Sequence, residues 1–317
     1  MAVYTHITQE TLQDFLPRYA LGDLHRLEGI REGVENTNYR LQTAQGHFIL
    51  TIFEDRTPAE DLPYFIELMR HAAGKDIPCP HPIGDRSGEI LKTIDGKPVV
   101  IFTELSGAAE LEPGIAQCGE VGRLLGRFHR AAEDFSGKRD NALGLAGWRP
   151  LIEEIGNKAD KIEPRLAQEL RDELDFIEHH WPRHLPQGTI HADLIPQNVL
   201  WQGKELTGMI DFYFSCNDIL AYDLAICLNA WCFASGHTQM EAQHAKAMIE
   251  GYETFRPLNH AEHDALSVLC RGAALRFLTT RLHDLFFTPA GALVTKKDPS
   301  EYLRKNRYFR VNDLFAA

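Results

Sequence analysis

The sequence predicts an α+β fold of two lobes: a small antiparallel β-sheet lobe with one helix over residues 1–104, and a larger, mostly helical lobe over residues 105–317. Alternating apolar and polar runs separated by turn residues dominate the first third of the chain, and apolar residues at helical spacing dominate the remainder. A chain of 317 residues with 44% hydrophobic residues is also long enough to bury a large core in two lobes.

The small lobe begins with residues 8–19, whose apolar residues recur at helical spacing. Two hairpins then follow from the turn signals 44–46 and Asp95-Gly96, the second of which is typical of tight hairpins. Their strands are expected over residues 38–43, 47–53, 89–94 and 98–105. Residues 58–74 predict a helix between the two hairpins.

The large lobe is predicted from amphipathic periodicity. Its helices are expected over residues 117–135, 163–181, 238–254, 260–286 and 300–309. Between the second and third of these helices, residues 199–201 and 206–210 read as two short strands joined by the turn 202–205. This small hairpin is expected to bring the residues at its two ends side by side.

Three polar side chains flank that hairpin in an informative order. Asp193 is followed five residues later by Asn198, and Asp211 follows the returning strand. In phosphoryl transfer from a nucleotide, such an Asp accepts the proton of the acceptor hydroxyl, and such an Asn and second Asp hold magnesium against the phosphates. We therefore expect Asp193 as catalytic base and Asn198 and Asp211 as magnesium ligands, with ATP as co-substrate.

The motif differs from that of protein kinases, because Ala192 replaces the Arg of His-Arg-Asp and Phe212-Tyr213 follows Asp211 in place of Phe-Gly. It resembles the aminoglycoside phosphotransferase superfamily, which phosphorylates small molecules on a protein-kinase-like fold. The resemblance implies that Asp223, in Tyr-Asp-Leu-Ala, is a buried strut for the catalytic loop. His191 is placed with the catalytic residues, as a brace for the same loop.

The resemblance also implies a nucleotide site in the small lobe. Residues 28–39, with Gly33, Asn36 and Asn38, stand where such folds place a loop over the phosphates, and Glu104 and Leu105 stand at the adenine-binding connector. Glycine there would let backbone N–H groups approach phosphate oxygens.

The lysine that usually holds the phosphates from the second strand is absent, and Thr51 occupies its position. Glu67 is either the former partner of that lysine or an exposed helix residue. Arg40, Arg31 or the backbone amides around Gly33 are the expected replacements for the missing charge.

Several segments resemble homoserine kinases of the aminoglycoside phosphotransferase type, and together they span nearly the whole chain. They are residues 50–54, 211–215, 271–282 and 297–303. The resemblance implies ATP-dependent phosphorylation of the side-chain hydroxyl of L-homoserine in threonine biosynthesis.

Such an amino-acid substrate needs a cation for its carboxylate, and the fork of an Arg suits that role. Arg276 and Arg281 are the candidates, with Arg276 ranked first, and Tyr213 and Trp231 are candidate pocket walls. Asp218, Glu35 and Asp284 stay equally open as partners for the substrate ammonium.

Two alternatives remain open. One is a kinase for another hydroxylated small molecule, such as choline, a methylthio sugar or an aminoglycoside. The other is a nucleotide-binding protein without turnover, which only the Thr51 substitution suggests. The complete set of Asp193, Asn198 and Asp211 favours an enzyme.

The composition limits partners and location. A net charge of −12 argues against a general nucleic-acid surface. We find neither a signal segment nor a long apolar span, so a cytoplasmic protein with no membrane partner is expected. The six cysteines form no C-x-x-C pair and are expected as reduced core residues. The sequence does not indicate an oligomeric state.

Overall fold

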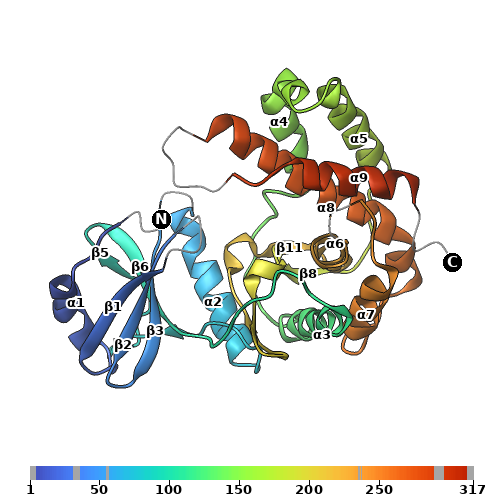
Figure 1. The fold of residues 1–317 in the computed structure, drawn as a ribbon. Helices are drawn as coiled ribbons and strands as arrows, with labels where there is room; N and C mark the ends of the chain where they lie inside the picture. The colour runs from blue at the N-terminus through green and yellow to red at the C-terminus, as the bar shows by residue number, and fades with distance from the viewer. Residues whose placement is uncertain are drawn as a thin grey trace.

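The computed structural model describes residues 5–30, 36–54, 57–234, 236, 238–288 and 296–312. A small β-sheet lobe lies beside a larger helical lobe (Figure 1), which confirms the predicted α+β architecture.

The small lobe is built on one antiparallel sheet. Its strands are β1 (Leu24–Ile30), β2 (Thr37–Thr43), β3 (Gly46–Ile52), β4 (Pro82–Ile83), β5 (Lys92–Ile94) and β6 (Lys97–Thr103). They are ordered β1-β2-β3-β6-β4, with β5 also paired to β6. In the β2–β3 register Asn38 lies opposite Thr51, which joins the two residues that the sequence assigned to the nucleotide site.

The two faces of this sheet bury different cores, because side chains alternate along a strand. On β6, Val99 and Ile101 belong to a core shared with helix α1 (Gln9–Phe15), whereas Val100 and Phe102 belong to the core of helix α2 (Leu62–Ala73). Figure 1 shows α1 and α2 on opposite faces of the sheet. The α2 core continues without a break into the large lobe, so the two lobes share one hydrophobic core.

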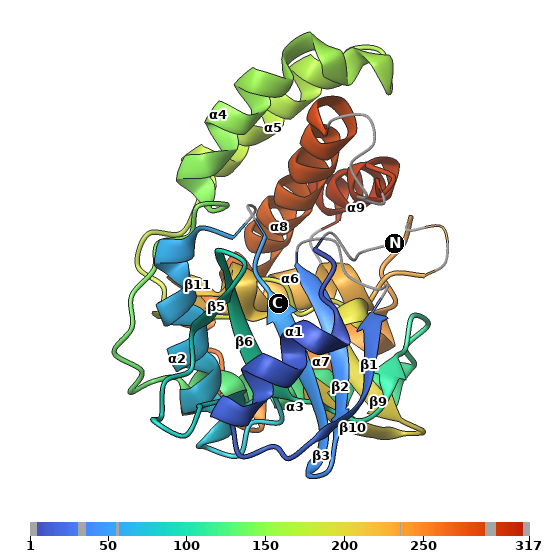
Figure 2. The same cartoon turned by 90° about the vertical axis from the view of Figure 1, so that its left-hand side faces the viewer.

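The large lobe is mostly helical. Its helices are α3 (Ile115–Ala131), α4 (Leu145–Ile155), α5 (Leu166–His180), α6 (Leu220–Trp231), α7 (Ala242–Glu253), α8 (His260–Phe287) and α9 (Ser300–Val311). Helices α4 and α5 lie on the side of the lobe away from α3 (Figures 1 and 2). Helices α3 and α7 approach closely at Gly122, where a Cβ atom would lie 2.0 Å from the Met248 carbonyl oxygen. Among the described residues, no helix is long and apolar enough to span a membrane.

Two short strand pairs carry the loops of the site. The hairpin β9 (Val199–Gln202) and β10 (Glu205–Met209) follows the predicted positions closely, and β7 (Ala108–Ala109) extends it. The second pair joins β8 (Gln187–Ile190) to β11 (Cys216–Ile219).

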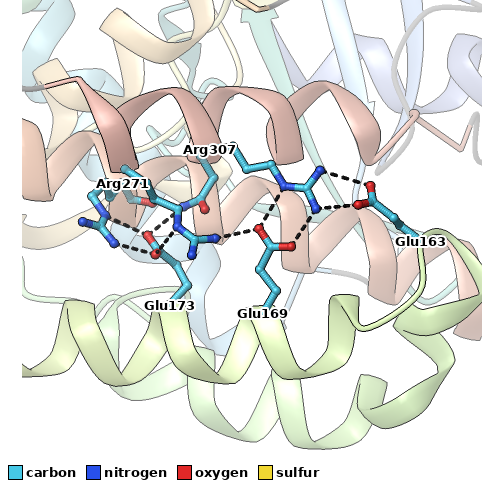
Figure 3. Close-up of polar contacts among 7 residues, drawn as sticks. Glu163, Glu169, Glu173, Arg271 and Arg307 are labelled. Atoms are coloured by element: carbon cyan, nitrogen blue, oxygen red, sulfur yellow. Dashed lines mark hydrogen bonds and ion pairs between the residues drawn. The ribbon is translucent and has the colours of Figure 1, made fainter.

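An ion-pair cluster ties α5 to α8 and α9, as Figure 3 shows. Buried Glu173 on α5 accepts hydrogen bonds from Arg271 of α8 and from Asn306 of α9. Arg307 of α9 bridges Glu163 and Glu169. These contacts dock the last helix onto the large lobe.

Several expected elements are corrected. The helix expected over residues 8–19 ends at Phe15 and continues as a 3-10 turn over Leu16–Arg18, because Pro17 has no backbone N–H to donate. The strand expected over 89–94 begins only at Lys92.

Other elements were missed. The segment 28–39, expected as a loop, begins with the last three residues of β1 and ends within β2. Helix α4 contains Pro150, a residue that argues against a helix, and α6 is buried on all sides and so lacks an amphipathic pattern. The six cysteines are buried free thiols, as expected.

Candidate active site

The catalytic loop leaves strand β8 at the interior of the large lobe. Asp193 is only 8% exposed, so a substrate hydroxyl that reaches it would leave bulk water. The amide Nδ2 of Asn198 donates to the Asp193 carboxylate over 3.0 Å and to the Asp193 carbonyl oxygen over 2.9 Å. The structure therefore brings together the two residues that the motif placed five positions apart.

His191 braces this loop. The Asp193 backbone N–H donates to Nδ1 of His191 over 3.2 Å, and the other ring nitrogen of His191 lies 3.1 Å from the Ile210 carbonyl oxygen. Burial lowers the pKa of His191, which keeps the ring neutral and fits one accepting and one donating nitrogen. Both ring nitrogens of His191 are therefore engaged by the backbone of the protein.

Ala192 holds the loop in an uncommon backbone conformation, with φ of 62°. Its N–H donates to the carboxylate of Asp223 over 2.9 Å, and its carbonyl oxygen accepts from the Arg276 guanidinium. The same guanidinium lies 3.9 Å from the Asp193 carboxylate. Hydrogen bonds on both sides of Ala192 offset the cost of this conformation and fix the direction of Asp193.

Asp223 lies fully buried under the loop on helix α6. Besides Ala192, it accepts from the His191 N–H over 2.7 Å and contacts His129 Nε2 at 3.1 Å. Burial alone would raise the pKa of Asp223, but the hydrogen bond from His129 and the neighbouring histidines hold it below its ordinary value. His129 in turn contacts the Tyr252 hydroxyl at 2.8 Å, which continues the network to α7.

Asp211 follows β10 with φ of 67° and ψ of 63°, a left-handed conformation that Asp adopts more readily than most non-glycine residues. The Ile210 N–H donates to the Asn198 carbonyl oxygen over 2.9 Å, so the hairpin places Asp211 next to Asn198 as predicted. Among the described residues, no three His, Cys, Asp or Glu side chains gather as a metal cage. An oxygen-donor pair completed by phosphates is the set that magnesium uses in kinases, and Asn198 and Asp211 fit it.

A small pocket of about 120 Å³ opens beside the catalytic loop. Its lining residues are Thr57, Pro58, Arg139, Asn141, Ala142, Leu143, Tyr213, Phe214 and Arg276. Tyr213 also packs edge-on against Phe53 and Phe65 of the small lobe, with ring centroids 5.4 and 5.7 Å away. The candidate wall residue Tyr213 and the first-ranked Arg276 therefore line one pocket.

A larger pocket of about 520 Å³ lies between the connector after β6 and strands β1 and β2. Its lining includes the predicted connector residues Glu104 and Leu105. Arg40 donates to the Glu104 carboxylate over 2.5 Å, which directs this arginine to the connector. This arrangement does not support Arg40 as the replacement for the missing phosphate-binding lysine.

The other small-lobe candidates have structural partners. The Thr51 hydroxyl donates to Asn38 over 2.8 Å, and the side-chain oxygen of Asn36 accepts from the Glu54 N–H over 3.2 Å. Glu67 pairs with Arg70 on the same helix, which supports the reading of an exposed helix residue. Gly33, Arg31 and Glu35 lie outside the described residues.

The remaining substrate candidates are separated by their contacts. Arg281 pairs with Glu301 of α9 and does not appear in either pocket. Asp218 lies behind the small pocket, where it accepts from Asn141 over 2.7 Å, and burial raises its pKa. Asp284 lies near the end of α8, and its carbonyl oxygen accepts from the Thr288 N–H.

Trp231 is a core residue, since its indole donates to the Leu194 carbonyl oxygen over 2.8 Å and it is only 2% exposed. Arg139 was missed, because a single Arg in a connecting segment carries no sequence pattern. His129 was missed for the same reason, although its position on the buried face of α3 is a usable signal.

The chain is similar to known proteins over nearly all of its length. The sequence profile of the phosphotransferase enzyme family matches residues 26–258. A homoserine kinase of Rhodopseudomonas palustris (strain BisA53) is 51% identical over 315 residues, which covers 99% of this chain and 96% of that protein. A homoserine kinase of Rhizobium rhizogenes (strain K84) is 51% identical over 310 residues, covering 98% and 96%.

Solved structures share the fold at low identity. The amicoumacin kinase determined with AMP-PNP, Ca²⁺ and its ligand superimposes with a TM-score of 0.70 at 14% identity, covering 98% of this chain and 95% of that one. A spectinomycin phosphotransferase in complex with ADP and spectinomycin gives a TM-score of 0.68 at 13% identity, covering 98% and 96%.

Proposed function

This chain belongs to the phosphotransferase enzyme family, and from that premise we propose that it is an ATP-dependent homoserine kinase, forming O-phospho-L-homoserine for threonine biosynthesis. The assignment of homoserine as the substrate rests on one observation: about half of all residues, across both lobes, are identical to those of homoserine kinases. The cytoplasm is the compartment that we propose for the reaction.

Asp193 is the proposed catalytic base. Its carboxylate is oriented by Asn198 on one side and lies near the Arg276 guanidinium on the other. As the homoserine hydroxyl oxygen forms its bond to the γ-phosphorus, the bond from that phosphorus to the β,γ-bridging oxygen breaks. The hydroxyl proton passes to Asp193, and ADP leaves with the bridging oxygen.

Asn198 and Asp211 are the proposed magnesium ligands. The Nδ2 atom of Asn198 is engaged by Asp193, which leaves its Oδ1 as the metal-binding atom. Bound magnesium would neutralise charge on the phosphates during transfer. The β9–β10 hairpin holds the two ligands in register before the metal arrives.

His191 and Asp223 are proposed as positioning residues. They hold the backbone of residues 191–193 from two directions, through the ring of His191 and through the Asp223 carboxylate. Because transfer depends chiefly on geometry, a small displacement of the loop is expected to lower the rate strongly.

We propose that the nucleotide occupies the cleft bounded by the connector at Glu104 and Leu105, with Thr51 and the Gly33 segment on the phosphate side. The position of Glu104 and Leu105 in the larger pocket supports the base site. We place the lobe boundary after residue 104, since β6 ends at Thr103 and β7 already pairs with β9 of the large lobe. The side chains of Asn36 and Asn38 accept hydrogen bonds from Glu54 and Thr51, so they connect the start of β2 to the end of β3.

Arg276 and Tyr213 are proposed to contact the amino-acid substrate, because both line the small pocket beside Asp193. Arg281 is ranked below them, since its guanidinium is engaged by Glu301. The lining of the pocket by Thr57 and Pro58 of the small lobe and by Arg276, which contacts the catalytic loop, supports this proposal.

The test is ADP release from magnesium-ATP with L-homoserine, choline and kanamycin as separate acceptors. We expect turnover with L-homoserine that falls by roughly 10²- to 10⁴-fold in Asp193→Asn, the usual contribution of a general base. Asp264→Asn, an exposed Asp on α8, is the matched control and should keep the rate. Turnover with a different acceptor alone would refute the substrate, and turnover with none would favour nucleotide binding without catalysis.

A further inference from the structure

The small pocket beside the catalytic loop is lined by two arginines, whose neighbouring carboxylates, Asp61 and Asp193, lie outside the lining. Two of its lining residues are Arg139 and Arg276, and no Asp or Glu belongs to the lining that the described residues form. This polarity is opposite to the net charge of −12 for the whole chain. Two guanidinium groups in a confined pocket favour an anionic group on the bound molecule.

Arg139 is held by both lobes. Its backbone pairs with Asn217, through the Arg139 N–H to Asn217 Oδ1 at 2.9 Å and the Asn217 N–H to the Arg139 carbonyl oxygen at 2.7 Å. Its side chain reaches the small lobe, where Nε donates to Asp61 over 2.8 Å and the guanidinium lies 4.9 Å from the centre of the Phe65 ring. The arginine therefore has a fixed direction before any ligand arrives.

The guanidinium of Arg139 is only partly occupied by protein groups. Nη1 donates to the Ser215 carbonyl oxygen over 3.2 Å, while Nη2 makes no hydrogen bond to any described residue. The side chain is 19% exposed and its Nε is paired with Asp61, so Nη2 is the nitrogen available to an anionic group of a ligand. Asn141 is fixed next to it by Asp218 and by the Leu143 N–H.

From this geometry we propose that Arg139 is a specificity-determining residue that binds the α-carboxylate of the acceptor amino acid, together with Arg276. The inference rests on the proposed homoserine kinase function and deepens it. Arg276 lies 3.9 Å from the catalytic carboxylate, so the pocket joins the site of phosphoryl transfer to the carboxylate site. Arg139 itself connects the two lobes, through Asp61 and Phe65 on one side and Asn217 on the other. A substrate bound by Arg139 would therefore contact a residue that both lobes hold.

The test compares L-homoserine with 3-aminopropan-1-ol, which is homoserine without its carboxylate. The measured quantity is the ratio of kcat/KM for the two acceptors. We expect Arg139→Met to lower this ratio by about 100-fold, the effect of removing one partner of a buried charge pair, mainly through a higher KM for homoserine. Arg149→Met, which removes an Arg from an ion pair with Asp175 and Glu178, is the matched control and should keep the ratio.

Two results would overturn the proposal: equal losses with both acceptors, as a purely structural or phosphate-binding Arg would give, or an unchanged KM for homoserine. If the unmodified enzyme does not use homoserine, the proposed function fails and this inference fails with it. Should Arg139→Met not fold, Arg139→Lys keeps the charge without the fork, and a rise of about 10-fold in homoserine KM is expected. No change in that variant would also count against the proposal.

Discussion

The backbone N–H of His191 donates to the buried carboxylate of Asp223 over 2.7 Å. This bond joins the start of the catalytic loop to helix α6, and a second bond from the next residue uses the other carboxylate oxygen. The loop is thus held by one charged group that can accept from two adjacent N–H groups at once.

Asp223→Asn is expected to disturb the loop, because an amide presents one acceptor and one donor to two backbone donors. One N–H then loses its partner inside the protein, at a cost of about 1–3 kcal/mol in the free energy of unfolding. We expect kcat to fall more strongly than ATP affinity. Urea unfolding and nucleotide titration measure the two effects, and equal kcat for Asp223→Asn and the exposed-site control Asp264→Asn would contradict the role.

Asn198→Ala and Asp211→Asn are expected to raise the magnesium concentration needed for half-maximal rate. Each change would remove or weaken one of the two proposed oxygen ligands of magnesium. The measurement is the initial rate during a magnesium titration at fixed ATP. A magnesium requirement identical to that of the unmodified enzyme would argue against the assignment.

The motif around Asp193 predicted that Asp193, Asn198 and Asp211 lie together because its spacing reflects local geometry. Asn198 reaches Asp193 within one short turn, and the hairpin to Asp211 is specified by apolar strands and a turn. The same holds for the small-lobe strands 38–43 and 47–53, which match β2 and β3 within a residue.

The partners of individual arginines and the presence of helix α6 could not be predicted, because they depend on contacts between residues far apart in the sequence. The pattern of α8 places Arg276 and Arg281 on one helix but does not say that Glu301 of α9 pairs with the second. The direction of the Arg139 side chain is fixed only in the folded protein, where Asn217 binds its backbone and Asp61 binds its guanidinium. Helix α6 was missed because burial on every side removes the period by which helices are recognised.

The pH dependence of stability should carry a contribution from His191. Its pKa in the folded protein is lowered below 6.5 by burial, so as pH falls below about 6.5 the unfolded chain binds a proton that the folded chain resists. Stability is therefore full above that pH and declines with acidification, by at most about 1.4 kcal/mol per pH unit from this one group.

His191→Asn should flatten the decline in stability between pH 6.5 and pH 5, measured by urea unfolding at each pH. His179→Gln, a change at an exposed position on α5, should keep the slope of the unmodified protein. Parallel curves for His191→Asn and the unmodified protein would show that His191 titrates normally.

Glu173→Gln should destabilise the large lobe. The buried carboxylate faces Arg271 and also Arg310 at 3.4 Å, and the neutral amide would leave Arg271 without its counter-charge, whereas Arg310 keeps its pair with Glu169. Breaking a buried pair in this way costs about 3 kcal/mol. Thermal and urea unfolding measure the loss, and Glu120→Gln, in an exposed pair with Arg123, should change stability by less than about 0.5 kcal/mol.

The burial of α6 on every side has a consequence for the order in which the protein can be completed during synthesis. The helix that carries Asp223 is covered by α8, which also delivers Arg276 to the catalytic loop. A nascent chain that ends before residue 260 therefore exposes an apolar helix and lacks one of the groups that direct Asp193. Translation must reach the last sixth of the chain before the catalytic loop acquires its final form, so incomplete products are expected to aggregate without showing kinase activity.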